Sequence, residues 1–518
     1  MLVSAINERW SAYLILAIFI ASMIIVSVLS SKKAKSLDGF LLGDRGIGGW
    51  MSAFGYGTTY FSGVVFIGYA GTFGMSLGLS AVWIGLANAL VGSLLAWFIL
   101  AKRTRAMSQS LNAKTLPEFF EKRYSSSGLK LLSAIVIFIF LIPYSTSVYQ
   151  GIAYISEAVF GLDFVWCVVI MAVIASAYLF IGGYFANAVS NFIQGIIMLV
   201  GVIIMIALML ASSKVNGAEG LNKLIESGYG FFPSSESAGF WFDSPLMMLI
   251  TNMLITSVGI WAVPQSIQKF FAIRNNRAIV QGTVISTLFA LIVGGGAYFN
   301  GSLARLFFPE MPATGTANII PDMLLSNELM GYGILGFICI LVLAASMSTL
   351  SSLALVSASS LGVDVYKGFI KKDASEAHVK KLVSVLCIIF VMLSAVLAIL
   401  EIDAIVTLMS LSWGTLAGCF LGPYIFGLYS KKANKLGAFL SIGTTLVTTI
   451  VLIFVFGAVY GGNTFSELIS LGIKKSPIIG VTCMILSMIV TPIGMLFNKN
   501  EKIKVKNENL ELSFKEIQ

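Results

Sequence analysis

Residues 48–71 read GGWMSAFGYGTTYFSGVVFIGYAG, an apolar stretch long enough to cross a bilayer but far richer in glycine than an ordinary helix. The glycines at positions 55, 57, 63 and 68 stand beside small hydroxyl residues. Glycine lacks a Cβ atom, so it makes an unwound stretch of helix easier to form. Unpaired backbone at membrane depth is tolerated only where it lines a cavity or binds something. The stretch therefore predicts a membrane helix that is interrupted at a functional position.

The composition places the whole chain in a membrane. Of its 518 residues, 57% are hydrophobic and 11% are charged, whereas soluble domains carry about 25% charged residues. A spanning helix needs roughly 20 apolar residues. Thirteen segments qualify: 11–30, 47–73, 76–101, 129–158, 162–181, 190–213, 243–269, 279–304, 329–362, 380–399, 404–427, 434–458 and 477–497. Their length predicts an all-α polytopic membrane protein of about 13 helices rather than the shorter strands of a barrel.

A second interrupted segment stands at residues 252–271, NMLITSVGIWAVPQSIQKFF, with Gly259 and Pro264 near its middle. Proline removes a hydrogen bond of the helix and clashes with the preceding turn. Either segment alone could reflect close helix packing, because glycine and proline are common in membrane helices. The placement of the two segments in the chain indicates a functional role beyond helix packing. If spans 2–6 and 7–11 form two groups of five, an interrupted helix leads each group, and the groups cross the bilayer in opposite senses.

This arrangement predicts an inverted repeat whose two discontinuous helices hold a solute and ion site at the bilayer midplane, as in secondary transporters. The expected division of the chain has five parts. These are a first helix and loop (1–46), a first repeat (47–213), a second repeat (243–427), two extra helices (428–497) and a cytoplasmic tail (498–518).

Basic residues gather in alternate loops, for example in 102–123 and 367–381, and are sparse in the loops between. This pattern places the N-terminus outside and the C-terminus in the cytoplasm. It also accounts for the net charge of +9, so we expect no nucleic acid partner. Lysines and no small-residue cleavage site follow the first segment, which indicates a retained span rather than a signal peptide. The lysine- and isoleucine-rich composition suggests a bacterial inner membrane.

A further apolar segment is unusual for its hydroxyl groups. Residues 344–360 read AASMSTLSSLALVSASS. At 100° per residue, Ala345, Ser348, Thr349 and Ser352 share one face. Serines in membrane helices often bond back to their own backbone, and this explains Ser357, Ser359 and Ser360 well. It explains the adjacent pair Ser348–Thr349 less well, because two neighbouring hydroxyls can offer lone pairs to a cation.

The remaining polar residues favour sodium over a proton as that cation. Acidic residues lie near the ends of the spans, and the single histidine, His378, falls in a loop. A proton-coupled carrier needs a buried acid or histidine to titrate, whereas carbonyl and hydroxyl oxygens suffice for a small hard cation. The five cysteines show no spacing typical of disulfides or metal sites. No Ser–His–acid set, metal cluster or phosphate loop indicates an enzyme.

Five further motifs resemble those of the sodium/solute symporters, the family of the proline/sodium and pantothenate/sodium symporters and the sodium/glucose cotransporters. The motifs are FLLGDRGIGGW (40–50), TLPEFFEKRY (115–124), FIGGYFANAVSNFIQG (180–195), MSTLSS (347–352) and VDVYKGF (363–369). The resemblance runs from about residue 38 to 440. It implies a leucine-transporter-type fold of five plus five inverted helices with flanking helices, and Na+ as the coupling ion.

In this family, sodium is bound between the unwound part of the second span and the hydroxyl-rich helix. Carried over by position, the resemblance implies the carbonyls of Thr58, Phe61 and Ala345 and the hydroxyls of Ser348 and Thr349. For the solute we expect contacts from Ser62, Gly63, Tyr144, Trp261 and Gln265. The aromatic residues Tyr144 and Trp261 could equally serve as packing or interfacial residues.

Several departures from the family pattern limit what can be carried over. Tyr60 replaces an aspartate of the proline symporter, and Thr256 and Ile260 replace two of its aromatic residues, so proline is a poor candidate for the solute. Asn191 stands where many members have an aspartate linked to a further sodium site, so we expect one sodium ion per cycle. We expect Lys269 to anchor helices or to pair with an acid rather than to touch solute.

The sequence thus predicts a sodium-coupled symporter that imports a small organic solute, with an amino acid, pantothenate or a monocarboxylate preferred. A sugar or another neutral polar solute is the alternative. Another is a membrane sensor with the same fold, because some relatives carry signalling domains. A channel is less favoured still. The bilayer and the solute are the expected partners, and no obligate protein partner is evident.

Overall fold

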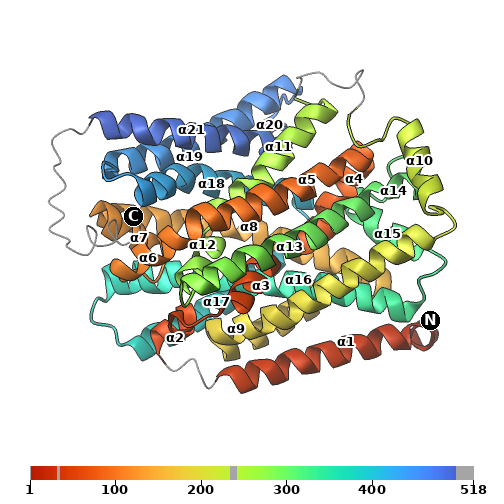
Figure 1. Ribbon diagram of the computed structural model, residues 1–518, viewed down its shortest axis with the longest axis horizontal. Helices are drawn as coiled ribbons and strands as arrows, with labels where there is room; N and C mark the ends of the chain where they lie inside the picture. Colours follow the sequence, from red (N-terminus) through yellow and green to blue (C-terminus); the bar gives the residue numbers. More distant parts are fainter. Residues whose placement is uncertain (1, 32–35, 234–241, 498–518) are drawn as a thin grey trace.

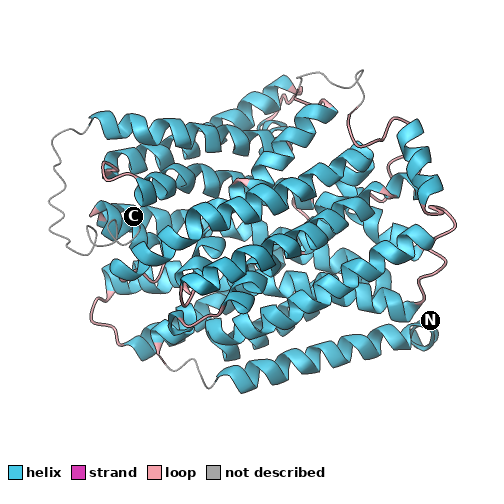
Figure 2. Ribbon diagram, in the orientation of Figure 1, coloured by secondary structure: helices cyan, strands magenta, loops and turns pink. Residues whose placement is uncertain are grey.

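The computed structural model describes residues 2–31, 36–233 and 242–497, and the predicted cytoplasmic tail 498–518 lies outside this range. Within the described residues the chain is helical, and its only β contact is an isolated bridge between Ile47 and Ile273 (Figure 2). By length and composition, ten helices are able to cross a membrane, or eleven if one bent pair counts as a span. The all-α polytopic architecture is therefore confirmed.

The first half of the chain contains α1 to α10 (Figure 1). The elements are α1 (Leu2–Ser31), α2 (Leu37–Leu42), η1 (Gly43–Arg45), α3 (Gly49–Tyr60), η2 (Val64–Tyr69), α4 (Ala70–Leu77), η3 (Gly78–Ala81), α5 (Val82–Ala87), η4 (Asn88–Leu95), η5 (Trp97–Ala101), α6 (Lys102–Ser110), α7 (Leu116–Tyr124), α8 (Ser127–Phe160), α9 (Phe164–Ala211) and α10 (Ala218–Glu226).

The second half contains α11 to α21. The elements are α11 (Pro245–Ser257), η7 (Gly259–Trp261), α12 (Pro264–Phe271), α13 (Asn276–Ser302), α14 (Ala304–Phe307), η8 (Thr316–Asn318), α15 (Ile319–Leu325), α16 (Tyr332–Ser359), η9 (Ser360–Ile370), α17 (Glu376–Ile399), α18 (Ile405–Tyr429), α19 (Lys435–Val459), α20 (Phe465–Ile473) and α21 (Ser476–Phe497).

Three helix ends define one face of the bundle. The Arg9 side chain, near the start of α1, donates to the Val159 carbonyl near the end of α8. The same guanidinium lies 5.2 Å from the centroid of the Tyr332 ring, at the start of α16. We call this side of the bundle the Arg9 face and the other side the opposite face.

Two long helical stretches each contain more than one pass. Phe164 at the start of α9 packs on Tyr154 of α8, and Ser212 just past its end bonds to Glu328 shortly before α16. Both ends of α9 therefore lie at the Arg9 face, and its 48 residues cover the predicted spans 162–181 and 190–213.

The continuous helical stretch from η2 to α6 also reverses. Gly78 begins η3 with a φ of 60°, a left-handed conformation that favours glycine. The chain then returns along α13. A Cβ on Gly74 would touch the Gly301 backbone, whereas on the return a Cβ on Gly282 would touch the Trp97 ring. The predicted spans 47–73 and 76–101 thus run side by side in opposite directions.

Both helices that the sequence predicts to be discontinuous are interrupted. α3 ends at Tyr60, Phe61 has φ −99° and ψ 95°, and π-helical backbone resumes at Val64. α11 and η7 meet α12 at a bend of 41° just before Pro264. α3 packs against α9, α13 and α16. Of the long helices, α16 and α18 are the most buried, so the first break lies in the interior of the bundle.

Candidate functional site

The break in α3 faces the hydroxyl groups of α16. The Ser348 hydroxyl donates to the Thr58 carbonyl at 2.7 Å and lies 2.8 Å from the Ala345 carbonyl of its own helix. The Thr349 hydroxyl lies 3.3 Å from the Thr58 carbonyl, 3.4 Å from the Thr59 carbonyl and 3.1 Å from the Ala345 carbonyl. Four of the five oxygens that the sequence selects for sodium therefore converge.

The fifth predicted oxygen, the carbonyl of Phe61, is not tied to this cluster. Phe61 donates its own N–H to the Gly57 carbonyl at 3.0 Å, and its ring stacks on Tyr60 with centroids 4.4 Å apart. No hydrogen bond in the described part of the chain joins its carbonyl to Ser348 or Thr349. Phe61 does lie at the unwound point itself, one residue past the end of α3.

The cluster is built from uncharged oxygen atoms and is chemically suited to binding a small cation. Thr58, Ala345, Ser348 and Thr349 are all fully buried, and the Thr58 hydroxyl oxygen has no hydrogen-bond partner among the described residues. Hydroxyls that donate to carbonyls here can rotate their hydrogens away and offer lone pairs. Carbonyl and hydroxyl oxygens are the ligands that hard cations take.

Beside this cluster lies the hydroxyl of Tyr144, on α8. Tyr144 is fully buried. The hydroxyl lies next to the side chains of Ser62, Thr349 and Trp413. Tyr144 therefore touches both the predicted ion ligands and the predicted solute contacts.

Trp413, on α18, is a residue that the sequence analysis missed. Its ring stands edge-on to Tyr144 with centroids 5.6 Å apart, and 6.0 Å from the ring of Tyr60. A Cβ on Gly259, in the second break, would lie 3.6 Å from the same indole. Both broken helices thus meet at Trp413. The only local signal was a bulky aromatic between Ser412 and Gly414 in a span rich in small residues.

Gly63 has a structural role at the break. Its N–H donates to the Ser346 hydroxyl at 3.0 Å, and a Cβ there would lie 2.4 Å from that oxygen. On its other side, a Cβ on Gly151 would meet the Gly63 backbone at 3.1 Å. Gly63 therefore allows α8 and α16 to approach the unwound segment closely. The Ser62 hydroxyl accepts a hydrogen bond from the Val64 N–H at 3.3 Å.

The second broken helix carries the other two expected solute contacts, Trp261 and Gln265. The Trp261 indole donates to the Val91 carbonyl of η4 at 3.0 Å, so its polar atom is engaged in helix packing. Gln265 is fully buried, and neither its amide oxygen nor its amide nitrogen has a partner in the described part of the molecule. No contact of the described residues joins either side chain to Tyr144.

A buried lysine lies one turn from the ion cluster. Lys269 is 4% exposed, and its ammonium donates to the Ser352 hydroxyl at 3.0 Å and lies 5.2 Å from the centroid of the Tyr184 ring. Ser352 also contacts the Thr59 hydroxyl at 3.2 Å. Lys269 thus anchors α12 to α16, one of the two roles expected. No acid among the residues described forms an ion pair with it. Both amide atoms of Asn191 are buried, and neither has a hydrogen-bond partner among the described residues.

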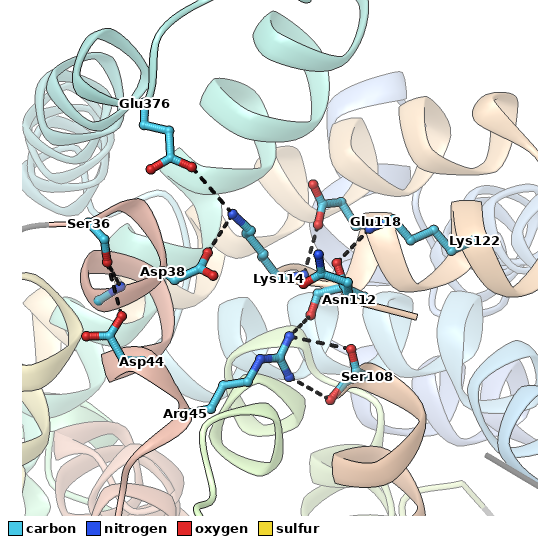
Figure 3. A network of polar contacts seen from close by, with 12 residues as sticks. Ser36, Asp38, Asp44, Arg45, Ser108, Asn112, Lys114, Glu118, Lys122 and Glu376 are labelled. Carbon is cyan, nitrogen blue, oxygen red and sulfur yellow. Dashed lines mark hydrogen bonds and ion pairs between the residues drawn. The ribbon is translucent and has the colours of Figure 1, made fainter. Parts of the chain in front are cut away.

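A network of polar contacts lies at the opposite face of the bundle (Figure 3). Lys114, between α6 and α7, lies 2.5 Å from an Asp38 oxygen on α2 and 3.9 Å from a Glu376 oxygen on α17. The Arg45 guanidinium donates to the Ala113 carbonyl at 2.7 Å and to the Phe271 carbonyl at 3.4 Å. Through Arg45, the segment before α3 contacts both the end of α12 and the loop between α6 and α7.

The described residues contain no group of three or more His, Cys, Asp or Glu side chains that could hold a metal ion. The five cysteines are free and buried.

Comparison with known proteins gives consistent results. The model of the sodium:solute symporter family matches residues 40–445. Sodium/proline symporter 2 of Staphylococcus saprophyticus is 29% identical over 468 residues, which cover 87% of this chain and 88% of that protein. A sodium/proline symporter of Staphylococcus aureus is 28% identical over 449 residues, 84% of each chain.

Solved structures share the fold. A Na+-coupled sialic acid symporter in a substrate-bound outward-open state superposes with a TM-score of 0.74 at 20% identity, covering 93% of this chain and 98% of that one. A nucleobase-cation-symport-1 family transporter gives a TM-score of 0.52 at 13% identity and covers 86% and 94% of the two chains. At these identities the likeness bears on the fold alone, and it confirms the predicted leucine-transporter-type architecture.

Proposed function

Because the chain belongs to the sodium:solute symporter family, we propose that it imports a small organic solute into the cell by alternating access, driven by the inward sodium gradient. Sodium-coupled symport is the activity of the family and of this chain. The proposed solute is an amino acid, pantothenate or a monocarboxylate. The curated relatives are sodium/proline symporters, but Tyr60, Thr256 and Ile260 depart from the proline symporter, so proline itself is not favoured.

The proposed sodium ligands are the carbonyls of Thr58, Phe61 and Ala345 and the hydroxyls of Ser348 and Thr349. One observation carries this assignment: two adjacent hydroxyls of a buried helix meet a carbonyl at the break of another buried helix. The positive charge of a bound sodium ion would be shared among several oxygen atoms, and its binding would require no group to gain or lose a proton. The site has no carboxylate, which suits an ion that must be released in every cycle.

The proposed orientation follows from the basic loops, with the N-terminus outside the cell and the Arg9 face toward the exterior. The chain offers a clean test, because all five native cysteines are buried. Lys372 and Lys223 are both exposed and lie in loops predicted to face opposite sides. A membrane-impermeant thiol reagent added to intact bacteria should label Lys223→Cys and spare Lys372→Cys. The reverse pattern would overturn the orientation.

The experiment that tests the ion coupling is a thermal unfolding measurement. The full chain, purified in detergent, is heated in sodium chloride and in equimolar choline chloride. A ligand that binds only the folded state raises the melting temperature, so a sodium-specific rise is expected. If sodium and choline give the same melting temperature, the proposed site does not bind sodium. Uptake into proteoliposomes that requires a sodium gradient then separates transport from a sensor, which would bind without accumulating solute.

A further inference from the structure

The buried side chain of Lys269, on α12, has no counter-ion in the described structure. An ammonium has three N–H donors. The described residues give this one a single acceptor, the Ser352 hydroxyl at 3.0 Å, together with the face of the Tyr184 ring. No charged side chain of the described chain forms an ion pair with Lys269 or acts on it electrostatically. Buried charges in folded proteins are paired or neutralised, so this lysine either loses its proton or shares its site with an anion.

A second polar group without a partner stands beside this lysine. Asn191, on α9, is fully buried, and neither atom of its amide has a hydrogen-bond partner among the described residues. A Cβ on Gly55, in α3, would lie 3.9 Å from the Asn191 amide nitrogen and 3.9 Å from Cδ of Lys269. The two side chains therefore flank the same glycine. Buried polar groups are nearly always paired, so an unpaired one calls for an explanation such as a bound ligand.

Gly55 leaves room for a small ligand between these side chains. A methyl group added there would make only ordinary van der Waals contacts, because its nearest neighbours would lie 3.9 Å away. The spacing is not general in α3, since a Cβ on Gly57 would lie 2.4 Å from the Phe289 ring. The room at Gly55 is about that of one methyl group. It suits a single atom rather than an organic anion or a phosphate.

The chemistry of the surrounding groups selects an anion. The Asn191 amide nitrogen and the Lys269 ammonium are both donors, and a donor to a charged acceptor forms a stronger hydrogen bond than a donor to a neutral one. A water molecule would pair with the amide but leave the charge of the lysine uncompensated. We propose that Lys269, Asn191 and Gly55 form a binding site for a chloride ion, enclosed by α3, α9 and α12.

A chloride ion in this place would also act on sodium, a consequence that rests on the proposed sodium site. The Ser352 hydroxyl, which accepts from Lys269, donates to the Ser348 carbonyl at 3.0 Å. The protonated lysine alone opposes sodium, whereas a lysine paired with chloride is neutral. For charges on the order of 10 Å apart at an effective dielectric constant of about 20, chloride should strengthen sodium binding by up to roughly tenfold.

The binding experiment uses the full chain in detergent without sodium. Choline gluconate is replaced stepwise by choline chloride at constant total concentration, and the melting temperature is followed. A ligand that binds only the folded state raises the melting temperature, so a rise that saturates with chloride is expected. If the melting temperature is the same in all mixtures, the lysine is not paired with chloride and the inference is wrong. This series contains no sodium, so its result does not depend on the proposed sodium site.

Two variants and a matched control locate the anion. Gly55→Ala fills the space with a methyl group that clashes with nothing, and Asn191→Asp places a carboxylate beside Lys269. Both variants should lose the chloride response. Gly443→Ala is the control, because Gly443 also lies within a helix, α19, and an added Cβ meets nothing within 4 Å. The control should respond as the wild type does. A chloride response that survives in both Gly55→Ala and Asn191→Asp would place the ion elsewhere and overturn the inference.

Sodium titrations in the two anions test the coupling. In the wild type the sodium midpoint should lie lower in chloride than in gluconate, and chloride binding should be strengthened by sodium by the same factor. Gly55→Ala should show the higher midpoint in both anions, and Asn191→Asp should show a low midpoint in both. A wild-type midpoint that is the same in both anions would refute the coupling. No response to sodium in either anion would refute the proposed function, while the choline series still decides the chloride site.

Discussion

Removing the Thr349 hydroxyl should weaken sodium binding and leave the fold intact. Thr349→Val keeps the volume of the side chain and deletes one oxygen that lies 3.1 Å to 3.4 Å from three carbonyls. Interactions of a polar group with a charged partner contribute roughly 1.5–3 kcal/mol. Because each 1.4 kcal/mol is about a tenfold change in affinity, sodium should bind roughly 10- to 150-fold more weakly.

A matched control lies ten residues further along the same chain segment. The Ser359 hydroxyl is also buried, at 2% exposure, but it donates only to the Val356 carbonyl of its own helix, at 3.0 Å. Ser359→Ala therefore removes a comparable helix back-bond without touching the break in α3. Each change should cost about 1 kcal/mol of stability or less without sodium. Only the sodium response should distinguish them.

The assay follows the melting temperature of each variant across a sodium titration at constant ionic strength. The midpoint for Thr349→Val should move to a higher sodium concentration, and that for Ser359→Ala should match the wild type. Ser348→Ala should resemble Thr349→Val, since its hydroxyl makes the shorter contact with Thr58, 2.7 Å. If Thr349→Val and Ser359→Ala shift the midpoint equally, the hydroxyl pair does not bind the ion and the reasoning fails.

Three further changes probe the surroundings of the site. Lys269→Met removes a buried amine that has no acidic partner in the described chain. In its protonated form, a lysine on the order of 10 Å from sodium opposes the ion by about 1.7 kcal/mol at an effective dielectric constant of about 20. A sodium titration should therefore show tighter binding in the variant, by up to roughly tenfold, and unchanged or weaker binding would contradict this. Gly63→Ala places a Cβ 2.4 Å from a serine hydroxyl oxygen of α16. Cells with this variant should lose sodium-dependent solute uptake although the variant protein reaches the membrane in normal amounts. Lys114→Gln removes the ion pair with Asp38 and should make the solute path more accessible from the opposite face. This is measured as faster alkylation of a cysteine introduced at the buried position 268. An unchanged alkylation rate would show that the polar network around Lys114 is not a gate.

Local patterns were enough to select the elements of the candidate site. The position of Ser348 and Thr349 on one face follows from the helical period alone, and the structure turns that face toward Thr58. The breaks follow from residues whose backbone preferences act locally, the glycines around Phe61 and the proline at 264. Such features need no knowledge of which helices become neighbours, so a single sequence contains them.

Features that depend on helix packing could not be obtained in this way. Trp413 meets Tyr144 across a separation of 269 residues, and no periodicity in α18 singles it out from other buried aromatics. Trp261 stays a predicted solute contact. Its indole donates to the Val91 carbonyl beside a bend of 41°, and no local pattern predicts that contact.

How deeply the Lys269 side chain is buried also depends on how the helices pack. Near the end of a predicted span, a lysine is expected to extend its ammonium toward the membrane surface. Here α12 is short and begins only after the bend at Pro264, and α3, α6 and α16 all pack against it. The side chain is therefore held inside, where its ammonium reaches Ser352, one helical turn from Ser348. In its protonated form, this buried lysine would oppose a second cation beside the proposed sodium site, and the single ion per cycle expected from Asn191 stays a prediction.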